Sequence, residues 1–162
     1  MKNIFTIKIN EQSGVSEARR LSSYAATAMG FNETDLGRIG IIVTEMCRNL
    51  VKHTKQGGEF LLFRIKRGTC EGLELLAIDK NPGIKNIAEA MRDGFSTAGS
   101  PGTGLGSIKR LSDFFDIYSL DGLGTAVLAR IWMNKQPVQE HKFEISGINL
   151  PKPGEQVSGD KW

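Results

Sequence analysis

Apolar side chains between residues 32 and 55 recur at the spacing of an α-helix, and this regularity constrains the fold more than any other feature of the chain. Five of them are separated by steps of three and four: Leu36, Ile39, Val43, Met46 and Leu50. Such spacing places them on one face of a helix. Asn32 or Thr34 can cap its N-terminus. The pattern predicts a long amphipathic helix that runs to about Lys55 and is stopped by Gly57 and Gly58.

Shorter patterns on both sides of this helix predict further strands and helices. Alternation of apolar and polar residues, or short apolar runs between turn signals, indicate strands at 4–10, 60–66, 73–79, 114–120 and 125–132. Helical spacing indicates helices at 16–29, 87–91 and 105–113. The segment 67–72, RGTCEG, is predicted to form a hairpin turn, which places Cys70 in that turn.

The size and composition of the chain are those of an ordinary globular domain. It has 162 residues, of which 40% are hydrophobic and 24% charged, which is enough to bury one core. The basic residues behind the net charge of +3 are scattered, so a nucleic-acid partner is not predicted. No apolar run approaches the roughly 18 residues of a membrane span. With two isolated cysteines and no signal peptide, we expect a cytoplasmic protein without a membrane partner.

The character of the sequence changes after residue 133. The remaining residues contain three prolines and little helical periodicity, which is typical of a linker followed by the start of another unit. We therefore predict a domain boundary that separates 1–133 from 134–162.

The predicted long helix carries a polar stripe with the chemistry of a catalytic site. Glu45, Asn49 and His53 follow one another at intervals of four, so they lie along one side of the helix, beside its apolar face. A partly shielded carboxylate can act as a base, and an amide oxygen one turn away is a suitable Mg²⁺ ligand. The alternative is an ordinary polar face with an i,i+4 pair.

An acidic residue ends the apolar strand 73–79. Asp79 could accept a hydrogen bond from an adenine amino group, and Gly83 would let the ring approach the backbone closely. The alternative is that Asp79 only opens an Asx-type turn. Thr125, at the start of the last strand, could bond to the same base, although threonine is also simply a good strand former.

Three glycines stand where the helix at 105–113 begins: Gly102, Gly104 and Gly106. Free backbone N–H groups at a helix start bind phosphate well. The run lacks the Lys-Ser/Thr ending of a Walker loop and does not follow a strand as a dinucleotide fingerprint would. The preceding residues 94–101 are small and polar, as in a mobile lid.

Taken together, these segments resemble the GHKL ATPase superfamily, and within it the small serine kinases of bacterial partner switches. The resemblance covers residues 3–132: 44–53 correspond to the N-box, 79–83 to the G1 box and 102–106 to the G2 box. It implies the Bergerat ATP-binding fold, an α/β two-layer sandwich with a mixed, mostly antiparallel sheet and helices on one face.

The resemblance also implies roles for individual residues. Glu45 would be the general base, Asn49 the Mg²⁺ ligand, and Asp79 the reader of adenine N6. The remaining ATP-binding positions would be Lys52, His53, Gly83, Gly102, Thr103, Gly104, Leu105, Gly106 and Thr125, with 94–101 as the lid.

The function implied is that of an ATP- and Mg²⁺-dependent protein serine kinase. Its substrate would be a STAS-domain protein of a partner-switching pathway, and a sigma factor, a fused phosphatase domain or a second copy of the chain are further possible partners. The alternative is a non-catalytic ATP-binding module that regulates a partner. Residues 152–160 resemble the opening of SpoIIE-type protein phosphatases, in which Asp160 would bind a metal once that domain is complete.

Overall fold

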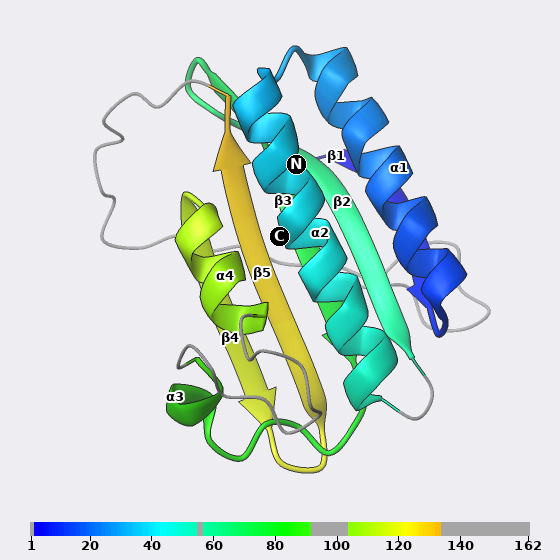
Figure 1. The fold of residues 1–162 in the computed structure, drawn as a ribbon. Coiled ribbons are helices and arrows are strands. Elements are labelled where there is room, and N and C mark those ends of the chain that lie inside the picture. Colours follow the sequence, from blue (N-terminus) through cyan, green and yellow to red (C-terminus); the bar gives the residue numbers. More distant parts are fainter. Residues whose placement is uncertain (1, 55–56, 92–103, 134–162) are drawn as a thin grey trace, which may run out of the picture.

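The computed structural model describes residues 2–54, 57–91 and 104–133 (Figure 1). Its elements in chain order are β1 (Lys2–Ile9), α1 (Gln12–Met29), α2 (Glu33–His53), β2 (Gly58–Arg67), β3 (Cys70–Asp79), α3 (Ile87–Ala90), α4 (Gly104–Leu111), β4 (Phe114–Leu120) and β5 (Gly124–Trp132). The predicted lid at 94–101, Gly102, Thr103 and the segment 134–162 with Asp160 lie outside the described residues. The predictions for them stay predictions.

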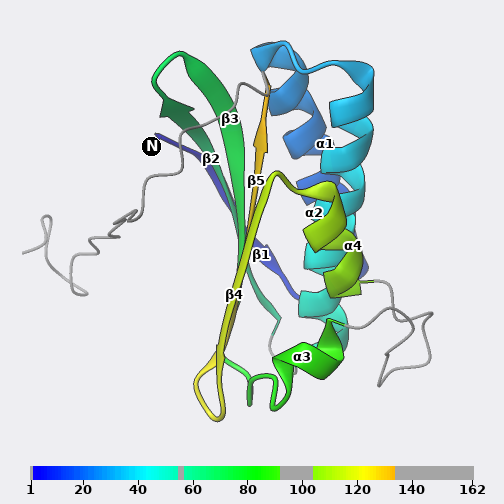
Figure 2. The same cartoon turned by 90° about the vertical axis from the view of Figure 1, so that its left-hand side faces the viewer.

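The strands form one sheet in the order β1-β2-β3-β5-β4. All four neighbouring pairs are antiparallel, so the described sheet contains no parallel pair. Figure 2 shows the helices gathered on one face of this sheet. The predicted two-layer architecture is confirmed, and the sheet is more uniformly antiparallel than the expected mixed one.

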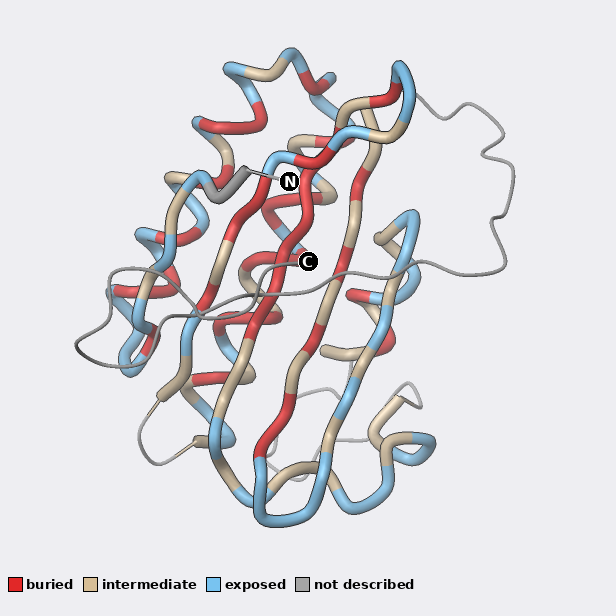
Figure 3. Tube along the Cα trace, turned by 180° about the vertical axis from the view of Figure 1, so that it is seen from behind, coloured by how far each residue is buried: buried red, intermediate tan, exposed pale blue. Residues whose placement is uncertain are grey.

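The core lies between the sheet and the two long helices. Strand residues of alternating positions point into it, among them Phe60, Leu62, Leu73 and Leu75, none of which is exposed. Burying each such side chain contributes about 1.5–3 kcal/mol. The burial is most continuous along the central strand β3, as Figure 3 shows from behind.

The long helix α2 matches the predicted pattern closely. Its apolar face, Ile39, Val43, Met46 and Leu50, is buried. Asn32 is the N-cap, and its side chain accepts a hydrogen bond from Asp35 N at 2.9 Å. Among the described residues, no helix is long and apolar enough to cross a membrane.

Helix α1 begins at Gln12, four residues before the predicted start at Ser16. Its first turn contains Gly14, which sequence rules disfavour in a helix. The structure supplies the reason for this glycine, because a Cβ atom there would lie 3.2 Å from Ile9 Cδ1. Close packing of the helix start against β1 therefore overrides the low helix propensity.

The prediction that Cys70 lies in a turn was wrong. The turn consists of Gly68 and Thr69, with Gly68 in the left-handed region at φ +59°. Cys70 already pairs with Arg67 in the β2–β3 ladder and is buried. Because the turn needs only two residues, both strands are longer than the apolar pattern alone suggested.

Gly58 does not end the long helix but begins β2, while Thr54 is the C-cap of α2. A Cβ atom at Gly58 would lie 2.7 Å from Leu50 Cδ2 and 2.4 Å from Ile78 O. The last turns of α2 therefore press directly on the sheet. This contact brings the polar end of the helix to the strand end that carries Asp79.

Candidate functional site

The first residue of α4 lies against the polar side of α2. A Cβ atom added to Gly104 would lie 3.3 Å from Asn49 Oδ1 and 3.5 Å from Glu45 Oε2. The predicted base and the predicted metal ligand are therefore neighbours of a glycine of the predicted phosphate loop, although more than fifty residues separate Gly104 from both in sequence. A side chain at this point would press on Asn49 and Glu45.

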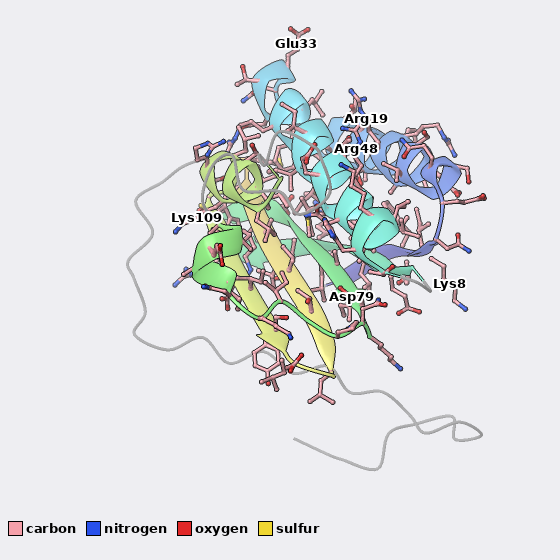
Figure 4. All side chains as sticks on the ribbon, turned by 60° about the horizontal axis from the view of Figure 1, so that its bottom comes forward. Lys8, Arg19, Glu33, Arg48, Asp79 and Lys109 are labelled. Atoms are coloured by element: carbon pink, nitrogen blue, oxygen red, sulfur yellow. The ribbon has the colours of Figure 1, made fainter. Side chains whose placement is uncertain are left out.

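Glu45 is partly shielded from water. Its side chain is 23% exposed, and the exposed Arg48 reaches Glu45 Oε1 at 3.5 Å. Figure 4 shows Arg48 on the outer side of α2 and Asp79 at the end of its strand. A carboxylate in this setting keeps access to a solvent-borne substrate. The contact with Gly104 favours the functional interpretation of Glu45 and Asn49 over an ordinary polar face.

The last turn of α2 borders the end of β3. Lys52 and His53 are both exposed. Partial burial lowers the pKa of His53, the charge of Lys52 lowers it further, and the charge of Asp79 raises it. The end of α2 that carries His53 is thus close enough to Asp79 for the two charges to interact.

Asp79, Thr125 and Ser119 form one row across three strands. The register pairs Asp79 with Thr125 between β3 and β5, and Thr125 with Ser119 between β5 and β4. Asp79 Oδ1 also accepts a hydrogen bond from Asn81 N at 2.9 Å, so the Asx-type turn considered above is present. A carboxylate has capacity for more acceptor bonds than this one, so the turn and a role in adenine recognition are compatible.

Two glycines close this end of the site by backbone-to-backbone contact. Gly83 has φ +84°, and a Cβ atom there would lie 2.4 Å from Leu120 O. Gly124 has φ +112°, and its Cβ atom would lie 2.0 Å from Asp79 O. The glycine requirement at 83 therefore arises from the protein's own backbone as well as from any ring that approaches it.

Ser119 is a residue that the sequence reasoning missed. Its hydroxyl oxygen accepts a hydrogen bond from Ile84 N at 2.7 Å and lies 2.9 Å from Thr125 Oγ1. It thus ties the loop after Gly83 to the strand that carries Thr125. The available signal was its position: Phe115 and Ile117, four and two residues earlier on the same face of β4, pack against the core, and a polar residue continues that face.

The described residues of the predicted phosphate loop, Gly104 to Gly106, belong to the start of α4. Leu105 is half-buried, Gly106 is buried, and Ile108 is fully buried one turn later, so the first turn of α4 is anchored in the core. The described residues contain no group of three or more His, Cys, Asp or Glu side chains that could hold a metal ion. Mg²⁺ fits this site nonetheless, because it commonly takes one or two protein oxygens together with phosphate and water.

The comparisons with known proteins agree with this geometry. Residues 10–131 match the family model described as histidine kinase-like ATPase domain. The chain belongs to this family. A histidine kinase-like ATPase domain of this kind is what the GHKL resemblance predicted, and that prediction is confirmed.

Individual relatives extend the match. The chain is 35% identical over 127 residues to the serine/threonine-protein kinase RsbT of Bacillus subtilis (strain 168), which covers 78% of this chain and 95% of that protein. The solved mycobacterial sensor histidine kinase MprB aligns with a TM-score of 0.50 at 16% identity, over 79% of this chain and 96% of that one. The second likeness concerns the fold alone.

Proposed function

We propose that this protein is an ATP- and Mg²⁺-dependent protein serine kinase whose substrate is a STAS-domain protein of a bacterial partner-switching pathway. The observation that carries the proposal is the meeting of Glu45, Asn49 and Gly104 at one point between α2 and α4. A base, an amide oxygen and an open helix start within a few ångströms are the groups that phosphoryl transfer requires.

The reaction assigns one step to each group. Glu45 accepts the proton of the substrate serine hydroxyl as its oxygen forms a bond to the γ-phosphorus of ATP. The bond between that phosphorus and the β–γ bridging oxygen breaks, and ADP leaves with the electron pair. The backbone N–H groups at the start of α4 hold the phosphates in line for this transfer.

Bound Mg²⁺ would neutralise charge on the transferring phosphates. Asn49 is the residue that would hold it, since its amide oxygen faces Gly104. Asp79 and Thr125, which face each other in the β3–β5 ladder, would bind adenine at the opposite end of the nucleotide.

The choice of a protein serine as acceptor is supported by the relative named serine/threonine-protein kinase, which is matched over nearly its whole length. Within the described residues the one histidine is His53, at the exposed end of α2. It lies in the ATP-binding segment and not on a separate acceptor helix, so autophosphorylation on histidine is not proposed.

The decisive experiment replaces Glu45 by Gln and follows transfer from γ-labelled ATP to a purified STAS-domain protein. We expect transfer to fall by about 10²–10⁴-fold, the usual contribution of a positioned base. Binding of Mg²⁺–ATP, measured by calorimetry, should change little because the amide keeps the shape of the carboxylate.

Glu33→Gln is the matched control. Glu33 is exposed on the same helix, twelve residues or about 18 Å from Glu45 along the axis, and its replacement should leave transfer intact. Undiminished transfer by Glu45→Gln would refute the assigned role of Glu45. Tight ATP binding without transfer by the wild-type protein would favour the non-catalytic module.

A further inference from the structure

Arg38 connects helix α2 to the far end of helix α4. Its Nε and Nη2 donate hydrogen bonds to Leu111 O at 2.9 and 2.7 Å. Its Nη1 binds Asp35 Oδ1 at 2.6 Å, and its Nη2 also binds Asp113 Oδ1 at 2.8 Å. One guanidinium group therefore caps the last carbonyl of α4 and is held by two carboxylates.

The contact continues into the sheet through Asp113. Its second oxygen, Oδ2, accepts a hydrogen bond from Trp132 N at 2.8 Å, and its own N–H donates to Arg130 O at 2.9 Å. The side chains of Arg38 and Asp113 are only 15% and 14% exposed. Shielding from water strengthens such charge-assisted bonds, so the end of α4 is fixed to both α2 and β5.

The two contacts between α2 and α4 lie at opposite ends of α4. The helices lie side by side and run in opposite directions (Figure 1), so the end of α4 meets Arg38 and its start meets Glu45 and Asn49. Arg38 and Glu45 are seven residues, or two turns, apart on the same face of α2. The eight residues of α4 span about 12 Å, which matches the separation of the two contacts.

We propose that Arg38 is a positioning residue that sets the placement of α4 along α2 and thereby holds the phosphate-binding start of α4 against Glu45 and Asn49. The inference rests on the proposed function, because it assigns Arg38 an effect on the triphosphate of ATP. Arg38 contacts the last residue of α4 and not its phosphate-binding start. It acts through the rigid helix between Leu111 and Gly104.

The chemistry of the contact requires arginine in particular. The planar guanidinium donates to one carbonyl and two carboxylates at once, with fixed angles between the bonds. A lysine retains the charge but offers a single nitrogen, so it cannot keep all these bonds. The substitution Arg38→Lys therefore loosens the placement of α4 without leaving the two aspartates uncompensated.

The test compares two ligands in the complete chain, Mg²⁺–ATP and adenosine, by calorimetric titration. Adenosine reports on the Asp79–Thr125 end alone, whereas ATP also depends on α4. We expect Arg38→Lys to weaken ATP binding by about tenfold, similar to the loss of an outer-shell partner in other sites, and adenosine binding by less than about twofold. Asp113→Asn, which keeps the bonds from Arg38 to Leu111, should act in the same direction with a smaller effect.

The control is Arg64→Lys, because Arg64 forms an ion pair with Glu71 at 2.6 Å, on the exposed surface beside the β2–β3 turn and away from the site. It should alter neither affinity. If Arg38 contributes to stability alone, Arg38→Lys should lower the affinities for both ligands equally or lower neither. Either result overturns the proposal. If Arg38→Lys does not fold, Asp113→Asn carries the same comparison. A wild-type protein that binds ATP but transfers no phosphate would refute the kinase proposal. The Arg38 proposal would still be tested, because a selective loss of ATP affinity in Arg38→Lys does not depend on phosphate transfer.

Discussion

The proposed adenine end and the proposed phosphate end of the candidate site are built from different kinds of contact. At the adenine end, backbone meets backbone: Gly83 lies against Leu120 O and Gly124 against Asp79 O. At the phosphate end, the side chains of Glu45 and Asn49 meet the start of α4, and Arg38 holds the other end of that helix. The first arrangement belongs to the sheet, the second to the packing of two helices.

This difference indicates at which end of the site residues can be substituted without loss of the fold. The strand register that aligns Asp79 with Thr125 is the same register that buries the core face of the sheet, so it cannot shift without exposing the core. The placement of α4 depends on a few side-chain contacts. We therefore expect substitutions at the adenine end to affect folding and binding together, and those at the phosphate end to affect ATP binding or phosphotransfer without loss of the fold.

The largest effect is expected from Gly124→Ala. The new Cβ atom would have to lie 2.0 Å from Asp79 O at a φ of +112°, so the turn must rebuild. We predict a loss of about 3 kcal/mol or more in the free energy of unfolding, measured by urea titration, together with loss of adenosine binding.

Gly122→Ala is the matched control for that variant. Gly122 also has a positive φ, +78°, but nothing lies within 4 Å of its added Cβ atom. Its free energy of unfolding should fall only by about 1–2 kcal/mol, the cost of holding an alanine in the left-handed conformation. Equal losses at 122 and 124 would show that the close contact with Asp79 O does not matter.

Gly104→Ala should separate stability from activity. Its backbone has no positive φ, so alanine in this first helical position should leave the free energy of unfolding unchanged or raise it by up to about 1 kcal/mol. The methyl group would press on Asn49 Oδ1. Since small misplacements of reacting groups are costly, we expect phosphotransfer to fall about tenfold or more.

Gly37→Ala provides the corresponding control on α2, because Gly37 is exposed and nothing lies within 4 Å of its added Cβ atom. It should stabilise the protein similarly and leave transfer unchanged. Full activity in Gly104→Ala would mean that the phosphate end tolerates a side chain, and the contrast between the two ends would then be wrong.

The smallest effect concerns His53, where the two ends meet. Burial and Lys52 lower its pKa, and Asp79 raises it. An NMR titration, with the two histidines of the chain assigned by His53→Gln, should therefore give a pKa below 6.5 for His53. Asp79→Asn should lower it further. An increase in that variant would contradict the proximity of Asp79 and His53.

The pKa of His53 also fixes the sign of its effect on stability. Its folded-state pKa lies below the unfolded value, so the unfolded chain takes up the proton first as the pH falls. His53 therefore has no destabilising effect above about pH 6.5 and disfavours the folded state as the pH falls through that range. The effect should be small because His53 is exposed.

Local patterns predicted most of the elements, and they also supplied the candidate site residues, whose roles stay predictions. The spacing of Leu36 to Leu50 determined which face of α2 is buried, and therefore that Glu45 and Asn49 stand at its border. The errors had two sources. The first turn of α1 contains Gly14, which packs tightly against Ile9, and the two-residue turn at Gly68 and Thr69 leaves Cys70 in a strand.

Contacts between distant segments could not be read in the same way. In the sequence, Ser119 is a single polar residue in a strand. Only the strand register shows that it lies beside Thr125 and Ile84 N. Arg38 and Leu111 are 73 residues apart, and nothing in the spacing of either segment indicates their hydrogen bonds.

The sequence by itself determined which residues share a face of a helix or strand, because backbone geometry repeats over a few residues. The tertiary structure alone decided that Gly104 reaches Glu45 and Asn49, that Asp79, Thr125 and Ser119 form one row, and that Arg38 ends α4. The physical reason is that these contacts follow from strand register and helix packing. Both are set by burial of the whole core, which no short segment encodes.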